Sequence, residues 1–302
     1  MAKSTSRPIK RSEPGRAGTS RAAQKPNQKN IVWLASYPKS GNTWTRIFLA
    51  NYLFNRAEPM PINQIHRLGI GDSIAKTYRM VANGPIDTRD MRAMLALRPK
   101  VLRGITGNGA DVNFVKTHNI RDIALGTELI PAPFTRSAVY ILRNPLDLLL
   151  SYARHYGLEH AQAAEAMARD DHLAHGDAET VPQYLGHWSR HVKSWTGRAP
   201  FPVLVLRYED LQTDPETQFA RLLEHIGVPL DPERLTRAVG FSSFGEVARQ
   251  ETETGFVEKS PSAERFFHGG KAGGWQTDLA PEIADRVMRD HGAVMRAHGY
   301  LT

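Results

Sequence analysis

One stretch near the start of the chain constrains the fold more than any other. Residues 31–36 form an apolar, β-branched run, Tyr37-Pro38 interrupts it, and an apolar pattern with helical spacing runs from Thr43 to Phe54. A strand, a short polar loop and a helix bring free N–H groups of the first helical turn together, where the helix dipole favours an anion. The loop adds a cation, hydroxyl groups and a flexible backbone position through Lys39, Ser40, Gly41 and Thr43. The stretch therefore predicts an anion-binding turn, and the alternative is an ordinary βα turn with a solvated lysine.

The positive charge of the chain is concentrated at its start. The formal net charge is +8, but residues 1–29 hold eight lysines and arginines against one glutamate, which leaves about +1 for the remainder. This segment is rich in Ser, Pro and Gly and nearly free of apolar residues. We therefore expect a disordered basic tail over residues 1–29 and one folded domain over residues 30–302. A basic tail is weak evidence that the folded domain itself binds nucleic acid.

Several protein classes are excluded or disfavoured by what the sequence lacks. The chain has no cysteine, which excludes disulfides, thiolate metal sites and a cysteine nucleophile. The tail has no apolar core of the kind found in secretory signals, and no run of 18 apolar residues indicates a transmembrane segment. We expect a cytoplasmic location, and the sequence does not indicate an oligomeric state.

Short apolar runs alternate with helical patterns along the rest of the chain. Further strands are expected at residues 112–115, 138–142 and 203–206, and residues 55–86 read as irregular. A helix is expected at residues 87–97, ended by Arg98-Pro99. Three more should begin at the cap-and-proline pairs Asn144-Pro145, Asp214-Pro215 and Asp231-Pro232. Much of 158–198 and residues 281–297 are also expected to be helical. This alternation is typical of an α/β fold with a central, mainly parallel sheet covered by helices on both faces.

Basic and titratable groups follow four of the expected strands. In parallel sheets, ligands bind at the carboxyl ends of the strands. Those ends carry Lys39, Lys116-Thr117-His118, Arg143 and Arg207-Tyr208-Glu209. Four such strand ends at one edge predict an anion-binding enzyme site.

A nucleotide kinase is one interpretation of this edge. The Walker pattern requires glycines before the lysine, and residues 33–38 provide none. Transfer from a nucleoside triphosphate also requires an acidic Mg²⁺ site, for which Glu209-Asp210 is the candidate. A turn before the next helix explains that pair equally well, so this interpretation has little support.

A donor held by lysines, arginine and backbone amides needs no metal. His118 is then a candidate general base for the acceptor, because the usual pKa of histidine lies near the working pH. Lys39 and Lys116 are candidates to stabilise negative charge on the leaving oxygen. A lone histidine is more often structural, but its position after Lys116 at a strand end favours catalysis.

Six motifs in order resemble the PAPS-dependent sulfotransferase family, especially its cytosolic type and bacterial relatives. The resemblance covers residues 31–276 and rests on residues 37–44, 115–118, 143–151, 206–211, 242–244 and 266–275. It implies a P-loop-like three-layer α/β fold for a single sulfotransferase catalytic domain. It also implies that PAPS (3′-phosphoadenylyl sulfate) is the donor, that adenosine 3′,5′-bisphosphate is the product, and that no metal takes part.

The resemblance further implies a role for each matching residue. His118 would be the base, with Lys39 and Lys116 stabilising the transition state. Donor contacts would come from Lys39, Ser40, Gly41, Asn42 and Thr43 at the 5′-phosphosulfate, Trp44, Tyr208, Ser242 and Phe244 around the adenine, Arg143 and Ser151 at the 3′-phosphate, and His268, Gly269, Gly270 and Lys271 in a closing loop. That loop departs from the family pattern, because His268-Gly269 stands where the family usually has Arg-Lys.

The remaining histidines have simpler interpretations. His187 and His191 have the i, i+4 spacing of some zinc sites, but no third ligand is evident and a structural role is favoured. The pairs His155/His160 and His172/His175 are interpreted as solvated, and Trp33 as a core residue.

The function predicted from the sequence is therefore sulfuryl transfer from PAPS to a hydroxyl, or less readily an amine, of a small-molecule or glycan acceptor. Two alternatives remain open: a P-loop-type kinase, and a non-catalytic nucleic-acid-binding protein acting through the basic tail. The composition of residues 55–115, 158–180 and 251–272, which should line the acceptor pocket, does not identify the acceptor.

Overall fold

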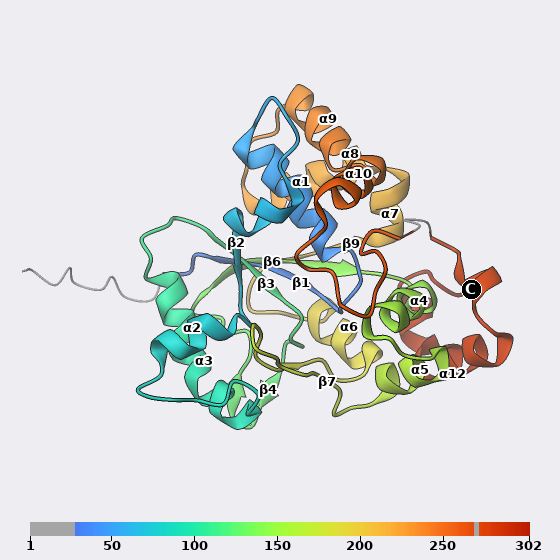
Figure 1. Cartoon of the computed structure of the whole chain (residues 1–302), viewed down its shortest axis with the longest axis horizontal. Coiled ribbons are helices and arrows are strands. Elements are labelled where there is room, and N and C mark those ends of the chain that lie inside the picture. Colours follow the sequence, from blue (N-terminus) through green and yellow to red (C-terminus); the bar gives the residue numbers. More distant parts are fainter. Residues whose placement is uncertain (1–27, 269–271) are drawn as a thin grey trace, which may run out of the picture.

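The computed structural model describes residues 28–268 and 272–302 (Figure 1). Residues 1–27 of the expected tail and the predicted loop residues Gly269, Gly270 and Lys271 lie outside the described residues. No helix within the described part of the chain combines the length and the apolar character needed to cross a bilayer.

A five-stranded parallel sheet forms the centre of the fold. Its order is β2-β3-β1-β6-β9, and it consists of β2 (Gly69–Gly71), β3 (Asn113–Thr117), β1 (Ile31–Ser36), β6 (Thr135–Leu142) and β9 (Val203–Arg207). The chain leaves β1 to pair first with β3 on one side and later with β6 on the other. The carboxyl end of β1 is therefore the topological switch point, where α/β sheets bind their ligands.

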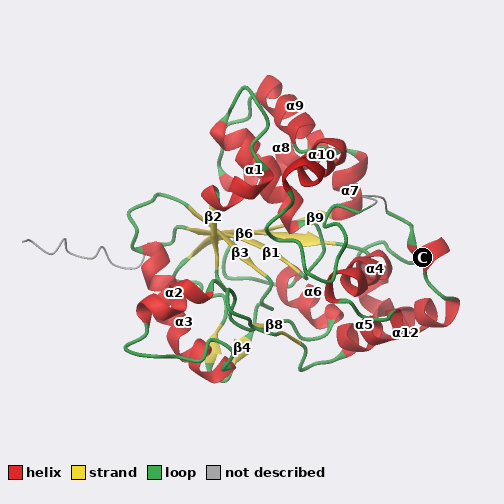
Figure 2. Ribbon diagram, viewed as in Figure 1, coloured by secondary structure: helices red, strands yellow, loops and turns green. Residues whose placement is uncertain are grey.

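Helices cover both faces of this sheet (Figure 2). One layer contains α1 (Asn42–Phe54), α7 (Tyr208–Thr213), α8 (Pro215–Ile226), α9 (Pro232–Phe241) and α10 (Phe244–Thr254). The other contains α4 (Pro145–Tyr156), α5 (His160–Ala168), α6 (Trp188–Thr196) and α12 (Pro281–Ala297). Each face of the sheet has its own hydrophobic core, and successive side chains of β1 point alternately into the two cores. Val32 and Leu34 pack with the first layer, and Trp33 and Ala35 pack with the second. The predicted three-layer α/β fold is confirmed.

Strand β2 was not predicted, because Gly69-Ile70-Gly71 has no apolar run. Gly69 pairs with Phe114 of β3, and a Cβ at Gly69 would lie 2.1 Å from the Phe114 carbonyl oxygen. The edge strand exists because a glycine permits this approach. The segment predicted as irregular also contains the 3₁₀ helix η1 (Ile62–Arg67) and α2 (Ala75–Val81).

The prediction that a helix ends at Arg98-Pro99 is wrong. Helix α3 runs over Met91–Thr106 with Pro99 inside it. Proline removes the N–H that would bond to the Leu95 carbonyl, and the Thr127 hydroxyl, 3.4 Å away, donates to that oxygen instead. Val101 and Leu102, beyond the proline, are buried, which offsets the cost of the proline.

Residues 158–198 are also less helical than predicted. A hairpin of β7 (Leu173–Ala174) and β8 (Gln183–Tyr184) separates α5 from α6, and a second hairpin, β4 (Ile123–Ala124) with β5 (Thr127–Glu128), precedes β6. The short helix α11 (Trp275–Asp278) precedes α12. The three cap-and-proline predictions are confirmed, because the side chains of Asn144, Asp214 and Asp231 each accept a backbone N–H of the helix that follows.

Candidate active site

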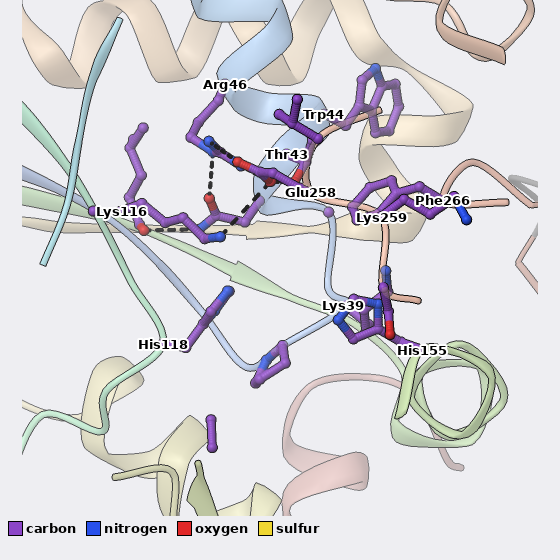
Figure 3. A pocket seen from close by; sticks show the side chains of 18 of the residues that line it. Lys39, Thr43, Trp44, Arg46, Lys116, His118, His155, Glu258, Lys259 and Phe266 are labelled. Atoms are coloured by element: carbon purple, nitrogen blue, oxygen red, sulfur yellow. Dashed lines mark hydrogen bonds and ion pairs between the residues drawn. The ribbon is translucent and has the colours of Figure 1, made fainter. Parts of the chain in front are cut away.

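The carboxyl ends of the strands open into a cavity of about 710 Å³ (Figure 3). Its wall includes most of the predicted site residues: Lys39, Gly41, Asn42, Thr43, Trp44, Lys116, His118, Arg143, Ser151, Tyr208, Ser242, Phe244 and His268. Ser40 is buried behind this wall. The sequence-based expectation that these distant segments converge at one edge of the sheet is met.

The turn between β1 and α1 has a backbone that few residues adopt. Lys39 has φ 69° and Gly41 has φ 104°, both in the left-handed region. A Cβ at Gly41 would lie 2.7 Å from the Tyr208 ring, so this position requires glycine. The turn delivers the chain into α1 with the first-turn N–H groups directed at the cavity end of the helix.

The polar side chains of this turn have different uses. The Asn42 side chain points into the protein, donating to the Leu34 carbonyl at 2.9 Å and accepting from Arg46 Nε at 3.1 Å. Asn42 therefore fixes the turn, and only its backbone is free for an anion. The buried Ser40 hydroxyl has no hydrogen-bond partner among the described residues, which suits a donor group reserved for a ligand.

Two lysines supply charge to the cavity in partly desolvated positions. Burial, then the charges of Arg143 and Lys116, lowers the pKa of Lys39 from 10.5 to about 8. Its Nζ lies 3.8 Å from the ring centroid of Phe266. Burial also lowers the pKa of Lys116, against the opposing effect of Glu258. A bound anion would favour the charged form of both lysines and would be attracted by it.

The geometry of His118 fixes its tautomer. Its Nδ1 lies 2.8 Å from the Ser36 carbonyl oxygen, which can only accept, so Nδ1 carries the hydrogen. Nε2 therefore holds the lone pair that a base requires. Burial and then the charge of Lys116 lower the pKa of His118 well below 6.5, which keeps the ring neutral at neutral pH.

His191 supports this arrangement from the second face of the sheet. Its Nδ1 accepts from the Tyr140 hydroxyl at 2.9 Å, and its Nε2 donates to the His118 carbonyl at 3.1 Å. His187 caps α6 by accepting the Arg190 N–H. No group of three His, Asp or Glu residues in the described ranges is placed to hold a metal ion, and the structural interpretation of this pair agrees with its contacts.

The first residues after β6 form the second end of the cavity. Arg143 Nη1 donates to the Lys39 carbonyl at 2.9 Å, and its guanidinium carbon lies 4.3 Å from the Tyr208 ring centroid. Its buried Nε has no partner among the described residues. Ser151 lies two turns along α4 and lines the same cavity.

Two cavity residues on α4 were missed by the sequence reasoning. Arg154 and His155 follow Ser151 at i+3 and i+4, a spacing that places them on the same helix face. The interpretation of His155 as solvated is wrong: burial, then the charges of Lys39 and Lys116, lowers its pKa to about 4. His172 is not simply solvated either, because its Nε2 forms a hydrogen bond of 2.8 Å with the Tyr152 hydroxyl.

The most important contact missed by the sequence reasoning is between Arg46 and Glu258. The two arms of the Arg46 guanidinium hold the carboxylate, with Nη1–Oε1 at 2.9 Å and Nη2–Oε2 at 2.6 Å. The Thr43 hydroxyl donates to Oε2 at 3.1 Å, and Lys116 Nζ lies 3.9 Å from the same oxygen (Figure 3). Burial acts to raise the pKa of Glu258, but Lys116 and Arg46 outweigh it and lower the pKa well below 4.5.

The predicted adenine side is an aromatic wall. Trp44 and Tyr208 meet edge to face with centroids 5.8 Å apart, and the Trp44 indole N–H donates to the Ser242 carbonyl at 2.8 Å. The Ser242 hydroxyl donates back to Ala238 within α9, so that its side chain serves the helix. Phe244 is 43% exposed and lines the cavity.

The candidate acidic metal site has a structural explanation. Glu209 Oε1 accepts the Asn144 N–H at 2.9 Å, and Oε2 accepts the Tyr300 hydroxyl at 2.9 Å. Asp210 lies 3.7 Å from Arg207. Glu209 thus ties the α4 N-terminus to the chain end, and the kinase interpretation loses its metal ligand.

Comparison with known proteins agrees with this geometry. The family model described as the sulfotransferase domain matches residues 29–299. The chain belongs to the sulfotransferase family. Curated relatives include cytosolic sulfotransferase 1 of Arabidopsis thaliana, 22% identical over 87% of this chain and 77% of the relative. Sulfotransferase 1A1 of Canis lupus familiaris is 27% identical over 90% of this chain and 85% of the relative.

Solved structures show the same sulfotransferase fold. Retinol dehydratase, in complex with androsterone and the inactive cofactor PAP, has a TM-score of 0.61 and 20% identity, covering 90% of this chain and 82% of that one. Mouse sulfotransferase SULT7A1, complexed with PAP, has a TM-score of 0.56 and 19% identity, covering 91% and 90%. This sulfotransferase therefore has the P-loop-like α/β fold expected from its sequence.

Proposed function

We propose that this sulfotransferase moves a sulfuryl group from PAPS to a hydroxyl group of a small molecule, releasing adenosine 3′,5′-bisphosphate. The observation that carries the proposal is the neutral His118 with its free Nε2 lone pair, in one cavity with Lys39 of the β1–α1 turn and Lys116 of β3. Family membership and the PAP-bound structural neighbours support the choice of donor.

The residues present fit such a donor. We assign the 5′-phosphosulfate to the α1 N-terminus, Thr43 and Lys39, which line the cavity. The buried Ser40 hydroxyl, which has no partner among the described residues, is a further candidate donor. Trp44, Tyr208 and Phe244 offer aromatic surface for the adenine. We assign Arg143, Ser151 and Arg154, which line the cavity together with His268, to the 3′-phosphate.

In the proposed reaction, His118 Nε2 takes the proton of the acceptor hydroxyl as its oxygen attacks the sulfur. The bond between sulfur and the bridging oxygen of the 5′-phosphosulfate breaks, and that oxygen keeps the electron pair. Lys39 and Lys116 stabilise the negative charge that develops there. The Ser36 carbonyl accepts from Nδ1–H and so stabilises the imidazolium formed during the transfer.

The low basicity of His118 bears on when the acceptor loses its proton. Its depressed pKa makes it a weak base, which is effective only when the proton leaves together with bond formation to sulfur. The wall of the cavity also includes the apolar residues Ile70, Phe114 and Val181. This wall suits an acceptor with an apolar body and one reacting hydroxyl group.

The test is donor turnover. With sulfur-labelled PAPS and a panel of phenols, sterols, alcohols and arylamines, we expect label on one or more hydroxyl acceptors and stoichiometric adenosine 3′,5′-bisphosphate. Transfer should proceed in the presence of a chelator. Phosphoryl transfer from ATP with Mg²⁺, and no sulfuryl transfer to any acceptor, would reject the proposal in favour of the kinase alternative.

A further inference from the structure

A carboxylate of the chain occupies donor groups that an anionic ligand would use. The Thr43 hydroxyl has one hydrogen, and in this structure the hydrogen goes to Glu258 Oε2. Lys116 faces the same oxygen. Thr43 and Lys116 are both assigned above to the sulfuryl end of the donor. A phosphosulfate and the Glu258 carboxylate are both oxyanions, and they would compete for the single hydrogen of the Thr43 hydroxyl and for the charge of Lys116.

Arg46 is fixed independently of Glu258. Its Nε donates to Asn42 Oδ1 at 3.1 Å and its Nη2 to the Thr43 hydroxyl oxygen at 3.0 Å, both within α1. Its side chain is only 9% exposed. The guanidinium therefore keeps its place at the cavity wall when the carboxylate leaves.

Glu258 is the more movable partner of the pair. It follows Val257, which is 73% exposed, on the segment between α10 and the Phe266-Phe267 pair. Both ends of that segment are anchored. Before Glu258, the side chain of Phe256 is buried. After Glu258, the backbone N–H groups of Phe266 and Phe267 donate to the Glu251 carboxylate. The Glu258 side chain can turn outward while these anchors stay in place.

We propose that Arg46 is a further anion-binding residue for the donor, and that Glu258 is a resident anion that the phosphosulfate displaces. This inference rests on the proposed function. Before the donor binds, Glu258 offsets the repulsion among Lys39, Lys116 and Arg46. After the donor binds, Arg46 and the Thr43 hydroxyl contact its 5′ group. When the product leaves, the return of Glu258 assists its release.

The experiment compares two ligands that differ only at the 5′ position, adenosine 3′,5′-bisphosphate and adenosine 3′-phosphate, by calorimetric titration. Glu258→Gln removes the competing charge, so the bisphosphate should bind about tenfold more tightly, as expected for a charge-assisted contact. Adenosine 3′-phosphate should bind within twofold of its affinity for the wild type. Glu179→Gln is the matched control, because Glu179 also lines the cavity but forms no ion pair among the described residues, and both affinities should stay unchanged.

A second substitution tests Arg46 itself. In the Glu258→Gln background, Arg46→Ala should weaken bisphosphate binding about tenfold and leave the 3′-phosphate unaffected. Thermal unfolding of each variant identifies any loss of folded protein.

The outcomes separate the two proposals. If folded Glu258→Gln binds the bisphosphate no more tightly than the wild type, Glu258 is a structural partner of Arg46 and the inference fails alone. If Arg46→Ala has no effect in that background, Arg46 does not bind the donor. If the wild type binds neither ligand, the proposed function and the inference both fail.

Discussion

The two ends of the proposed donor site differ in how their cations are paired. At the 5′ end, Arg46 and Lys116 face Glu258, a carboxylate of the same chain. At the 3′ end, Arg143 and Arg154 form no ion pair within the described residues. Burial lowers the pKa of Arg154, and the charge of Arg143 lowers it further. The positive charge of the 5′ end is partly offset by a carboxylate of the chain, and the 3′ end presents positive charge that is not paired in this way.

This difference suggests separate tasks for the two ends. Unpaired guanidinium groups favour any dianion that reaches them, so that the 3′ end should supply affinity and discrimination between nucleotides. The 5′ end must bind the reacting group, release its product and hold the catalytic base. A competing carboxylate limits affinity there while leaving His118 and the lysines in position.

Removal of the proposed base at the 5′ end should lower the rate of sulfuryl transfer without lowering the affinity for the nucleotide. His118→Ala should lower the rate of sulfuryl transfer by about 10²- to 10⁴-fold, the usual contribution of general acid–base catalysis. Its affinity for adenosine 3′,5′-bisphosphate should change less than threefold. Single-turnover transfer and calorimetry measure the two effects; undiminished transfer in the folded variant would show that His118 is not the base.

The 3′ end should lose affinity in a ligand-specific way. Arg143→Ala should weaken binding of adenosine 3′,5′-bisphosphate by about 10- to 100-fold, the range for a hydrogen bond between charged groups. Adenosine 5′-phosphate, which lacks the 3′ group, should bind within about threefold of its wild-type affinity. An equal loss for both ligands would mean that Arg143 acts through Lys39 or Tyr208, which it contacts, and not on the 3′-phosphate.

The charge of Lys39 should make the 5′ end sensitive to alkaline pH. Its pKa of about 8 means that the charged form prevails below pH 8 and is lost above it, whereas both phosphates of the ligand are already ionised above pH 7. Affinity for the bisphosphate should therefore fall about tenfold from pH 7 to pH 9. Lys39→Arg, which stays charged, is the control and should show a flat profile; parallel declines would assign the effect to another group.

Arg154 should give the smallest effect, because it is partly exposed on α4 and partly screened by solvent. Arg154→Ala should weaken bisphosphate binding about two- to fivefold and leave adenosine 5′-phosphate unaffected. Arg154→Lys should restore part of the loss. No change in the affinity for either ligand would remove Arg154 from the 3′ end and leave Arg143 and Ser151 there.

The sequence predicted those parts of the site that depend on short-range geometry. Strand ends, the turn at Lys39 to Thr43 and the helix begun at Asn144 are local features, and their placement at one edge follows from a parallel sheet. Arg154 and His155 were within reach of the same reasoning through their helical spacing from Ser151. The sequence reasoning passed over them because charged residues on a helix are usually solvated.

The remaining features depend on tertiary contacts. Glu258 reaches Thr43 across 215 residues of sequence, from a polar segment without a periodic pattern. The continuation of α3 through Pro99 required a hydroxyl from the later residue Thr127. Strand β2 required a glycine opposite Phe114. None of these has a local signature, because in each case the stabilising partner lies elsewhere in the chain.

The account rests on a site with two anion-binding ends, and one titration series tests it most directly. The wild-type protein, with a chelator present, is titrated with adenosine 3′,5′-bisphosphate, adenosine 5′-phosphate and adenosine 3′-phosphate. We expect the bisphosphate to bind at least tenfold more tightly than either monophosphate. The 3′-phosphate should bind more tightly than the 5′-phosphate, because Glu258 competes for the groups at the 5′ end. Equal binding of the three ligands, or tight binding of the 5′-phosphate alone, would contradict it.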